Sequence, residues 1–84
     1  MVVQASGDAI KRYKRVFRAA YNYMEQAEGA LAKAAEDEPE ALDRAWEAVS
    51  AEGADLIEQW DCDALIIDML TAIANELYKR YYGE

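Results

Sequence analysis

The pattern of apolar and polar positions divides the chain into three amphipathic segments. In the last, residues 64–82, the apolar side chains spread over an arc of about 200° when each residue turns a helix by about 100°. A helix that is apolar over half its circumference has to be covered from two directions. The arc consists of Leu65, Ile66, Met69, Leu70, Ile73, Ala74, Leu77 and Tyr81. A narrow polar strip, which we expect to face water, is made by Asp68, Thr71, Asn75 and Lys79.

The first segment, residues 9–35, has apolar positions that alternate in steps of three and four. This spacing is typical of a heptad seam and predicts one long helix, about 40 Å from end to end. The helix over residues 64–82 would be only about 27 Å long. We therefore expect the first helix either to break or to pack its overhang on something else, such as another copy of the chain. The predicted seam is Ile10, Tyr13, Phe17, Ala20, Met24, Ala27, Leu31 and Ala34.

The clearest break in the pattern is the acidic run that ends at Pro39. Proline is favoured in the first turn of a helix, so we expect a second helix over residues 39–60. Gly53 within it marks either a kink or a close approach by a neighbouring helix. Residues 61–63 are typical of a cap and turn. The chain is thus predicted to be all-α: a single domain, 1–84, folded as a small antiparallel three-helix bundle with a long first helix. The alternative is a second helix that continues through residues 61–63, giving a helical hairpin completed by dimerisation.

Composition supports a helical chain and adds an uneven charge. Alanine is abundant, whereas the 84 residues include only four glycines and one proline. The net charge is −8, but residues 1–24 carry +4 and residues 25–76 carry −13. Such a chain can attract itself, within one copy or between copies, and we expect a homodimer. The basic stripe is Lys11, Lys14, Arg15 and Arg18. Because the whole chain is acidic, we interpret this stripe as a solvated face that pairs with acids, and we expect no direct binding of nucleic acid.

Missing residue types exclude several classes of chemistry. The chain has no histidine, so triads and histidine-ligated metals are excluded. A single cysteine, Cys62, makes neither an internal disulfide nor a cysteine-rich zinc site. It agrees with a reducing compartment, so we expect a cytoplasmic protein. No apolar run is as long as a membrane span, so we expect no membrane partner.

Two pairs of carboxylates leave one catalytic possibility open. Glu25-x-x-Glu28 and Glu58-x-x-Asp61 resemble the E-x-x-E … E-x-x-D signature of the all-α (MazG-like) nucleoside triphosphate pyrophosphohydrolases. This resemblance implies that the four carboxylates hold Mg²⁺ for a bound triphosphate. Helical periodicity instead places Glu25 and Glu58 away from the apolar faces, on the side exposed to solvent. The magnesium-dependent enzyme is therefore the alternative function.

The acids and the tyrosines favour a non-enzymatic module that binds a protein partner and needs no cofactor. Clustered carboxylates on a small helical scaffold can imitate nucleic acid and occupy the basic groove of a nucleic-acid-binding protein, as a phage-type inhibitor does. Tyrosines beyond those that a small core needs are typical of protein interfaces. The candidate partner-binding residues are Glu36, Asp37, Glu38, Glu40, Tyr21, Tyr23, Tyr78, Tyr81 and Tyr82.

Overall fold

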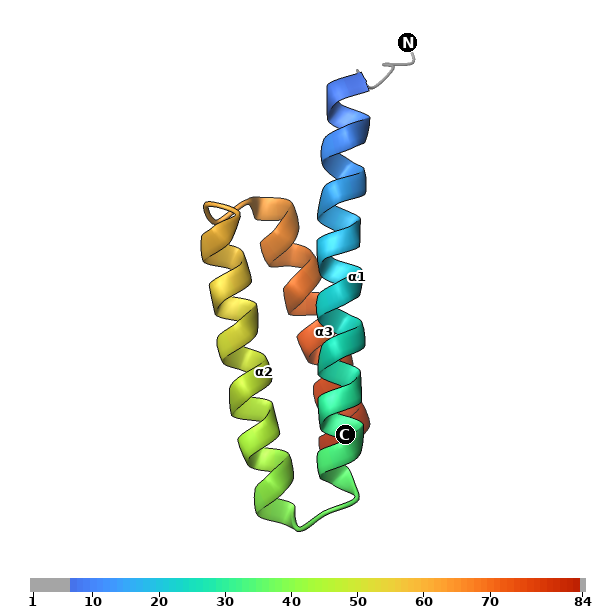
Figure 1. Ribbon diagram of the computed structural model, residues 1–84, viewed down its shortest axis with the longest axis vertical. Helices are drawn as coiled ribbons and strands as arrows, with labels where there is room; N and C mark the ends of the chain where they lie inside the picture. The colour runs from blue at the N-terminus through green and yellow to red at the C-terminus, as the bar shows by residue number, and fades with distance from the viewer. Residues whose placement is uncertain (1–6, 84) are drawn as a thin grey trace.

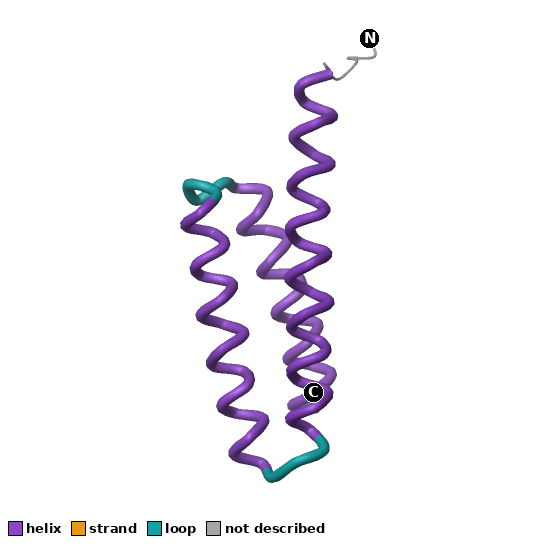
Figure 2. Tube along the Cα trace, viewed as in Figure 1, coloured by secondary structure: helices purple, strands orange, loops and turns teal. Residues whose placement is uncertain are grey.

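The computed structural model describes residues 7–83, which form three α-helices joined by short turns. They are α1 (Gly7–Ala35), α2 (Pro39–Gln59) and α3 (Ala64–Tyr82). Helices α1 and α3 run in the same direction and α2 runs against both (Figure 1; Figure 2). The predicted all-α three-helix bundle with a long first helix is therefore confirmed. Residues 1–6 and 84 of the predicted domain lie outside the described residues.

Local chemistry sets the ends of the helices. Pro39 occupies the first turn of α2, as predicted. Asp63 caps α3, where its carboxylate accepts hydrogen bonds from the backbone N–H groups of Leu65 (2.9 Å) and Ile66 (3.4 Å). Gly83 ends α3 in the left-handed region, with φ of 70°. The start of α2 and both ends of α3 thus follow from residues whose conformational preference the sequence already reveals.

The turn between α2 and α3 shows that the hairpin alternative is wrong. Helix α2 ends at Gln59, and the two residues Asp61 and Cys62 have φ of 53° and 56°. A helix cannot continue through two successive left-handed residues. The backbone N–H of Cys62 donates instead to the carbonyl of Ile57 at 2.9 Å, which closes the end of α2. The chain therefore reverses here within one copy.

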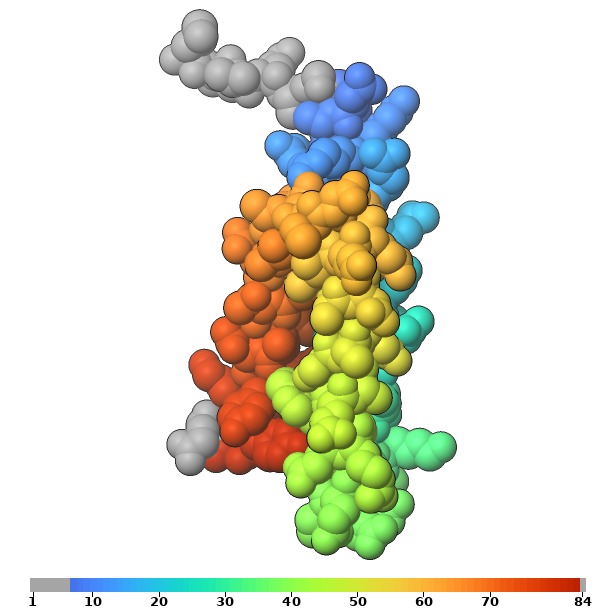
Figure 3. Space-filling view, turned by 90° about the vertical axis from the view of Figure 1, so that its left-hand side faces the viewer, coloured from blue at the N-terminus to red at the C-terminus, as the bar shows by residue number. Residues whose placement is uncertain are grey.

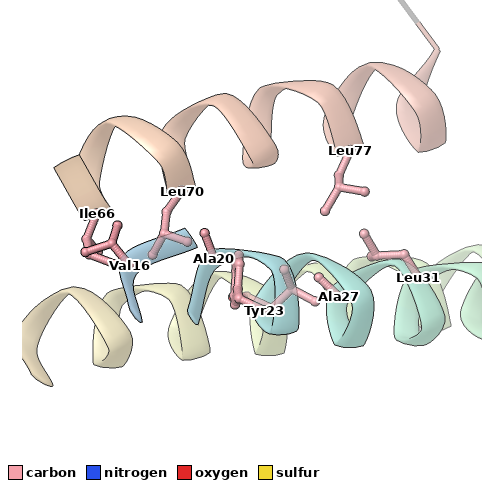
Figure 4. Close-up of a cluster of buried hydrophobic side chains, with 9 residues drawn as sticks. Val16, Ala20, Tyr23, Ala27, Leu31, Ile66, Leu70 and Leu77 are labelled. Atoms are coloured by element: carbon pink, nitrogen blue, oxygen red, sulfur yellow. The ribbon is translucent and has the colours of Figure 1, made fainter. Parts of the chain in front are cut away.

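The core lies along the line where α1 meets the other two helices. Side chains of α3 point toward α1 in Figure 4, with Ile66 beside Val16 and Leu77 near Leu31. Helix α1 contacts both α2 and α3 more extensively than these contact each other. It is therefore α1 that takes the central place, while α3, with its wide apolar arc, contacts both of the other helices as expected. The buried apolar side chains are Val16, Ala20, Tyr23, Ala27, Leu31, Val49, Ile66, Leu70 and Leu77.

The predicted seam of α1 is wrong in half of its positions. Ala20, Ala27 and Leu31 are buried as expected, but the core also takes Val16 and Tyr23, which the seam omitted. These two lie roughly 100–120° around the helix from Phe17. The exposed members of the seam are Ile10, Tyr13, Phe17 and Met24. Helix α1 carries two adjacent apolar stripes that share alanines, and the bundle buries only one of them.

Gly53 explains why the stripe with Tyr23 is the buried one. A Cβ atom at Gly53 would lie 2.8 Å from the hydroxyl oxygen of Tyr23, so only glycine leaves room for this ring. The hydroxyl donates a hydrogen bond of 2.8 Å to the backbone carbonyl of Val49, one turn earlier on α2. Helix α2 continues through Gly53. Of the two interpretations of this glycine, close approach of a neighbouring helix is therefore correct.

The bundle leaves apolar surface uncovered on both α1 and α3. Helix α1 has 29 residues against 19 in α3, and its first turns extend past the other two helices (Figure 1). On α3, Met69 and Ile73 are only partly buried, whereas the predicted polar strip is exposed as expected. Within one copy, no described helix covers these apolar positions of α1 and α3.

Candidate functional site

The four carboxylates of the alternative enzyme are not brought together. Glu25 and Glu58 are exposed on α1 and α2, and Asp61 is exposed in the turn after α2. Glu28 is occupied by contacts within the bundle: its carboxylate accepts hydrogen bonds from Arg80 (2.7 Å) and from the hydroxyl of Tyr81 (3.0 Å). Between residues 7 and 83, no group of three or more acidic or cysteine side chains lies close enough to hold a metal ion. The geometry therefore gives the magnesium site no support.

The acidic candidates form one exposed end of the bundle. Glu36, Asp37, Glu38 and Glu40 lie in or beside the turn between α1 and α2, at the end away from the overhang of α1 (Figure 3). Asp37 accepts a hydrogen bond of 2.8 Å from the backbone N–H of Glu38. The carboxylate of Glu38 lies 3.8 Å from Arg44, and both side chains are well exposed. Such an exposed pair contributes little to stability, so these acids remain accessible.

The basic stripe lies at the opposite end and is also exposed. Within the described part of the chain, Lys11, Lys14, Arg15 and Arg18 form no ion pair. Arg12, beside them, has a structural role, because it binds the carboxylate of Asp63 and ties α1 to the start of α3. This contact holds the pKa of Asp63 below its ordinary value. The basic residues of α1 therefore lie at the same end of the bundle as the acidic turn between α2 and α3, which includes Asp61 and Asp63, so the charge separation read from the sequence is not a separation between the two ends of the bundle.

The five candidate tyrosines divide into four environments. Tyr21 is exposed on α1, whereas Tyr23 is buried in the core, which corrects its assignment as a partner-binding residue. Tyr81 is partly buried against Glu28, and burial together with that contact raises the pKa of its phenol. Tyr78 and Tyr82 lie near the C-terminal end of α3.

Tyr78 and Tyr82 belong to a small aromatic cluster with Trp46 of α2. Their rings stack with centroids 5.0 Å apart, and the Trp46 ring meets both edge-on at 5.6 and 5.9 Å. The Tyr82 hydroxyl donates a hydrogen bond of 2.8 Å to Asp43. Desolvation and this acceptor raise the pKa of Tyr82 to about 12. The cluster joins α2 to α3 where their contact is otherwise slight, so its first role is structural.

The least expected surface is an apolar one. Five large side chains of α1 are each between 38% and 57% exposed and follow one another along a single stripe. Three of them, Phe17, Tyr21 and Met24, line a hollow of about 380 Å³ between α1 and α3, which Met69 and Ile73 complete on the α3 side. We call this surface the apolar face; its α1 members are Ile10, Tyr13, Phe17, Tyr21 and Met24. Contiguous apolar surface of this kind marks binding sites for other proteins more often than scattered single residues do.

The sequence did contain the signal for this face. Four of its five α1 members stood in the predicted seam, and the excess length of this helix was expected either to break or to pack on something else, such as another copy of the chain. Tyr21 was a candidate for partner binding on its own, without the stripe to which it belongs. The signal was therefore the excess of apolar positions on α1 over what two short helices can cover.

Comparison of the chain with protein-family models, with curated proteins and with solved structures found no match. None of the helices described between residues 7 and 83 combines the length and the apolar character that crossing a membrane requires. The function of this chain therefore has to be inferred from its own surfaces.

Proposed function

We propose that this chain is a non-enzymatic helical interaction module that binds another protein chain through its apolar face. The observation that carries the proposal is the exposure of Phe17 and Tyr21 beside the hollow completed by Met69 and Ile73. Water contact of these side chains is unfavourable, and covering them with a partner would remove that cost. Aromatic residues and methionine are enriched in the centres of protein interfaces. The face thus has the composition of a binding surface.

Site-specific photo-crosslinking tests this proposal. A photoreactive amino acid at Tyr21 would report contacts of the face, and the same amino acid at Asn22 is the matched control, because the neighbouring position is also exposed but points to the other side of α1. In cells that express the chain, irradiation should give a discrete covalent adduct with a protein from position 21 and none from position 22. Absence of an adduct from position 21, or equal adducts from both, contradicts the proposal.

The acidic end supports a second binding surface on the same module. Its four carboxylates are exposed, and Glu38 alone among them forms an ion pair with a described residue, at 3.8 Å. A basic groove, such as that of a nucleic-acid-binding protein, is the complementary partner. Reversing the charge of these four acids should abolish capture of such a partner. Reversing four exposed acids on α2 is the control, and equal losses from both sets contradict a role for this end. These control acids are Glu47, Glu52, Asp55 and Glu58.

A further inference from the structure

We propose that the partner of the apolar face is a second copy of this chain, with the two α1 helices packed antiparallel about a two-fold axis at Phe17. This inference rests on the proposed function, since it names the protein that the face binds. Because it also states which residues of the two copies meet, this inference can be wrong even if the proposed function is right.

The exposed stripe has the symmetry that such an interface needs. In a two-fold interface, whenever residue i of one copy contacts residue j of the other, residue j also contacts residue i. Phe17 lies at the centre of the stripe, Tyr13 and Tyr21 lie four residues to either side, and Ile10 and Met24 lie seven to either side. Two antiparallel copies centred on Phe17 therefore place Tyr13 opposite Tyr21 and Ile10 opposite Met24, twice over. Every exposed apolar residue of the stripe meets another one.

The stripe also ends where this pairing ends. Glu28 comes one turn after Met24 on the same side of α1 and is bound by Arg80 and Tyr81 of α3. This polar cluster closes the apolar face in the direction of the acidic end. At the other end, Ile10 and Tyr13 lie on either side of Arg12, which binds Asp63 at the start of α3, and both are exposed.

The hollow between α1 and α3 lies where the second copy would place the ring of its Tyr13. It is lined on α1 by Phe17, Tyr21 and Met24, the level that faces the overhang of an antiparallel copy centred on Phe17. Tyr13 of the second copy, opposite Tyr21, then enters the hollow beside Met69 and Ile73 of α3. The part of α3 that its own bundle leaves uncovered is covered in this way.

The area is sufficient for a specific contact. Aromatic side chains have roughly 150–250 Å² to bury, so five large side chains that are each about half exposed leave on the order of 500 Å² per copy. Two copies together bury about 1,000 Å², which is the lower bound for a specific interface. The two lining residues of α3 add to this area. The expected complex is therefore a dimer of moderate affinity.

Charge favours the antiparallel direction. Lys11 lies on the same flank of the stripe as Glu25, and antiparallel packing about Phe17 brings Lys11 of one copy to within about 3 Å, along the helix axis, of the level of Glu25 of the other. Parallel packing would bring the five cations of residues 11–18 of both copies to the same level. Arg18 is the unfavourable charge in the antiparallel arrangement, because it lies close to the axis and approaches its own counterpart. In the antiparallel dimer, opposite charges thus meet at both ends of the contact between the two α1 helices, and like charges meet only at its centre.

Disulfide crosslinking between single cysteine substitutions distinguishes the antiparallel register centred on Phe17 from other ways of pairing two α1 helices. In a Cys62→Ser background, which removes the exposed native thiol, Phe17→Cys should form a disulfide between two copies under mild oxidation. Tyr13→Cys and Tyr21→Cys should each remain uncrosslinked alone and should crosslink to each other when mixed. In the proposed register, two copies of position 13 are about 12 Å apart along the axis, whereas a disulfide needs Cα atoms within about 7 Å.

Sedimentation of the chain without cysteine substitutions gives the second measurement. The wild type should dimerise at micromolar concentration, and Phe17→Glu should weaken dimerisation by about 100-fold or more, since the charge is placed twice at the centre of the contact. Asn22→Glu, on the other side of α1, should leave it unchanged. Phe17 is half exposed and lies outside the core, and circular dichroism should show unchanged helicity for both variants.

The outcomes separate this inference from the function on which it rests. Self-crosslinking of Tyr13→Cys and of Tyr21→Cys, each alone, indicates a parallel pair and overturns it. A monomeric wild type at high micromolar concentration, with an adduct to a different protein from position 21, also overturns it but leaves the interaction module intact. A monomer without any adduct from the apolar face overturns both.

Discussion

Substituting Gly53 by alanine should destabilise the bundle, although alanine is the better helix former. In an unobstructed helix interior, Gly→Ala stabilises a protein by about 1 kcal/mol. At Gly53 the new Cβ would lie 2.8 Å from the hydroxyl oxygen and 3.3 Å from Cζ of Tyr23. The ring must then move, and its buried hydrogen bond to the carbonyl of Val49 is lost.

The size of the effect follows from these opposing contributions. A buried polar group that loses its partner costs about 1–3 kcal/mol, and forcing an extra methyl group into a packed site costs about 1–3 kcal/mol. Against a gain of about 1 kcal/mol, we expect Gly53→Ala to lower the free energy of unfolding by about 3 kcal/mol. In a domain of this size, each kcal/mol corresponds to about 4–8 °C in Tm.

Two matched variants isolate the cause. Gly29 lies in α1 with open space around the position of its Cβ, so Gly29→Ala should show the full stabilisation of about 1 kcal/mol. Tyr23→Phe removes the oxygen that Cβ would strike and leaves the ring at 3.3 Å, so Gly53→Ala in that background should be neutral or stabilising. The coupling between the two positions should therefore be about 3 kcal/mol.

Urea denaturation followed by circular dichroism measures all four chains of this double-mutant cycle. The reasoning is refuted if Gly53→Ala stabilises the protein by about 1 kcal/mol with Tyr23 present, as Gly29→Ala does. That result would mean that Tyr23 does not pack on Gly53 and that the buried stripe of α1 is assigned incorrectly.

Substitutions at three further residues, Asp63, Tyr82 and Cys62, test the ends of the helices and the aromatic cluster. Asp63→Asn keeps an N-cap oxygen but loses the charge that Arg12 binds, so its Tm should fall by less than that of Asp63→Ala. Because the pKa of Asp63 is lowered on folding, its stabilisation should be present above pH 3.8, where the free carboxyl titrates, and lost as pH falls below it, and Asp63→Asn should remove this pH dependence. The pKa of Tyr82 is raised from 10.0 to about 12, so its contribution should be complete below pH 10 and lost between pH 10 and about 12, and Tyr82→Phe should remove that part of the alkaline unfolding curve. Cys62→Gly should raise the free energy of unfolding by about 1 kcal/mol because glycine accepts a φ of 56° without strain, whereas Cys62→Ala should not; a gain from both variants contradicts this explanation.

The boundaries of the fold could be predicted because each depends on a few neighbouring residues. Pro39 starts α2, Asp63 caps α3 and Gly83 ends it, each through a preference that acts over one helical turn. The turn before α3 was expected for its aspartates. Its two left-handed residues, Asp61 and Cys62, carry no distinctive signal in the sequence, because neither is glycine.

The buried face of α1 could not be predicted in the same way, because it depends on contacts between helices. Counting apolar positions favours the stripe through Phe17 over the stripe through Val16 and Tyr23. The choice is made by Gly53, thirty residues after Tyr23, which admits the tyrosine ring beside α2. Periodicity within one helix contains no information about which neighbour has a space of the right shape.

Periodicity within one helix also explains which candidate site residues could be predicted from the sequence and which could not. The acids at the turn are exposed as expected, since a run of four carboxylates around a proline has no place in a core. Tyr21 and Tyr23, two residues apart and alike in chemistry, lie on different sides of α1, one exposed and one buried. Only the position of α2 and α3 around the helix distinguishes them.

The two apolar stripes of α1 connect the fold to the proposed function. A helix that had only to complete a three-helix bundle would need the stripe through Val16 and Leu31 and could be polar elsewhere. A helix of 29 residues that carries a second stripe, centred on Phe17 and extending past its neighbours, is suited to covering by another chain. The apolar arc of α3 is wider than its own bundle covers. Its partly buried residues Met69 and Ile73 therefore also need another chain to cover them. Two independent excesses of apolar surface, on different helices, meet at one face, and a single partner helix accounts for both.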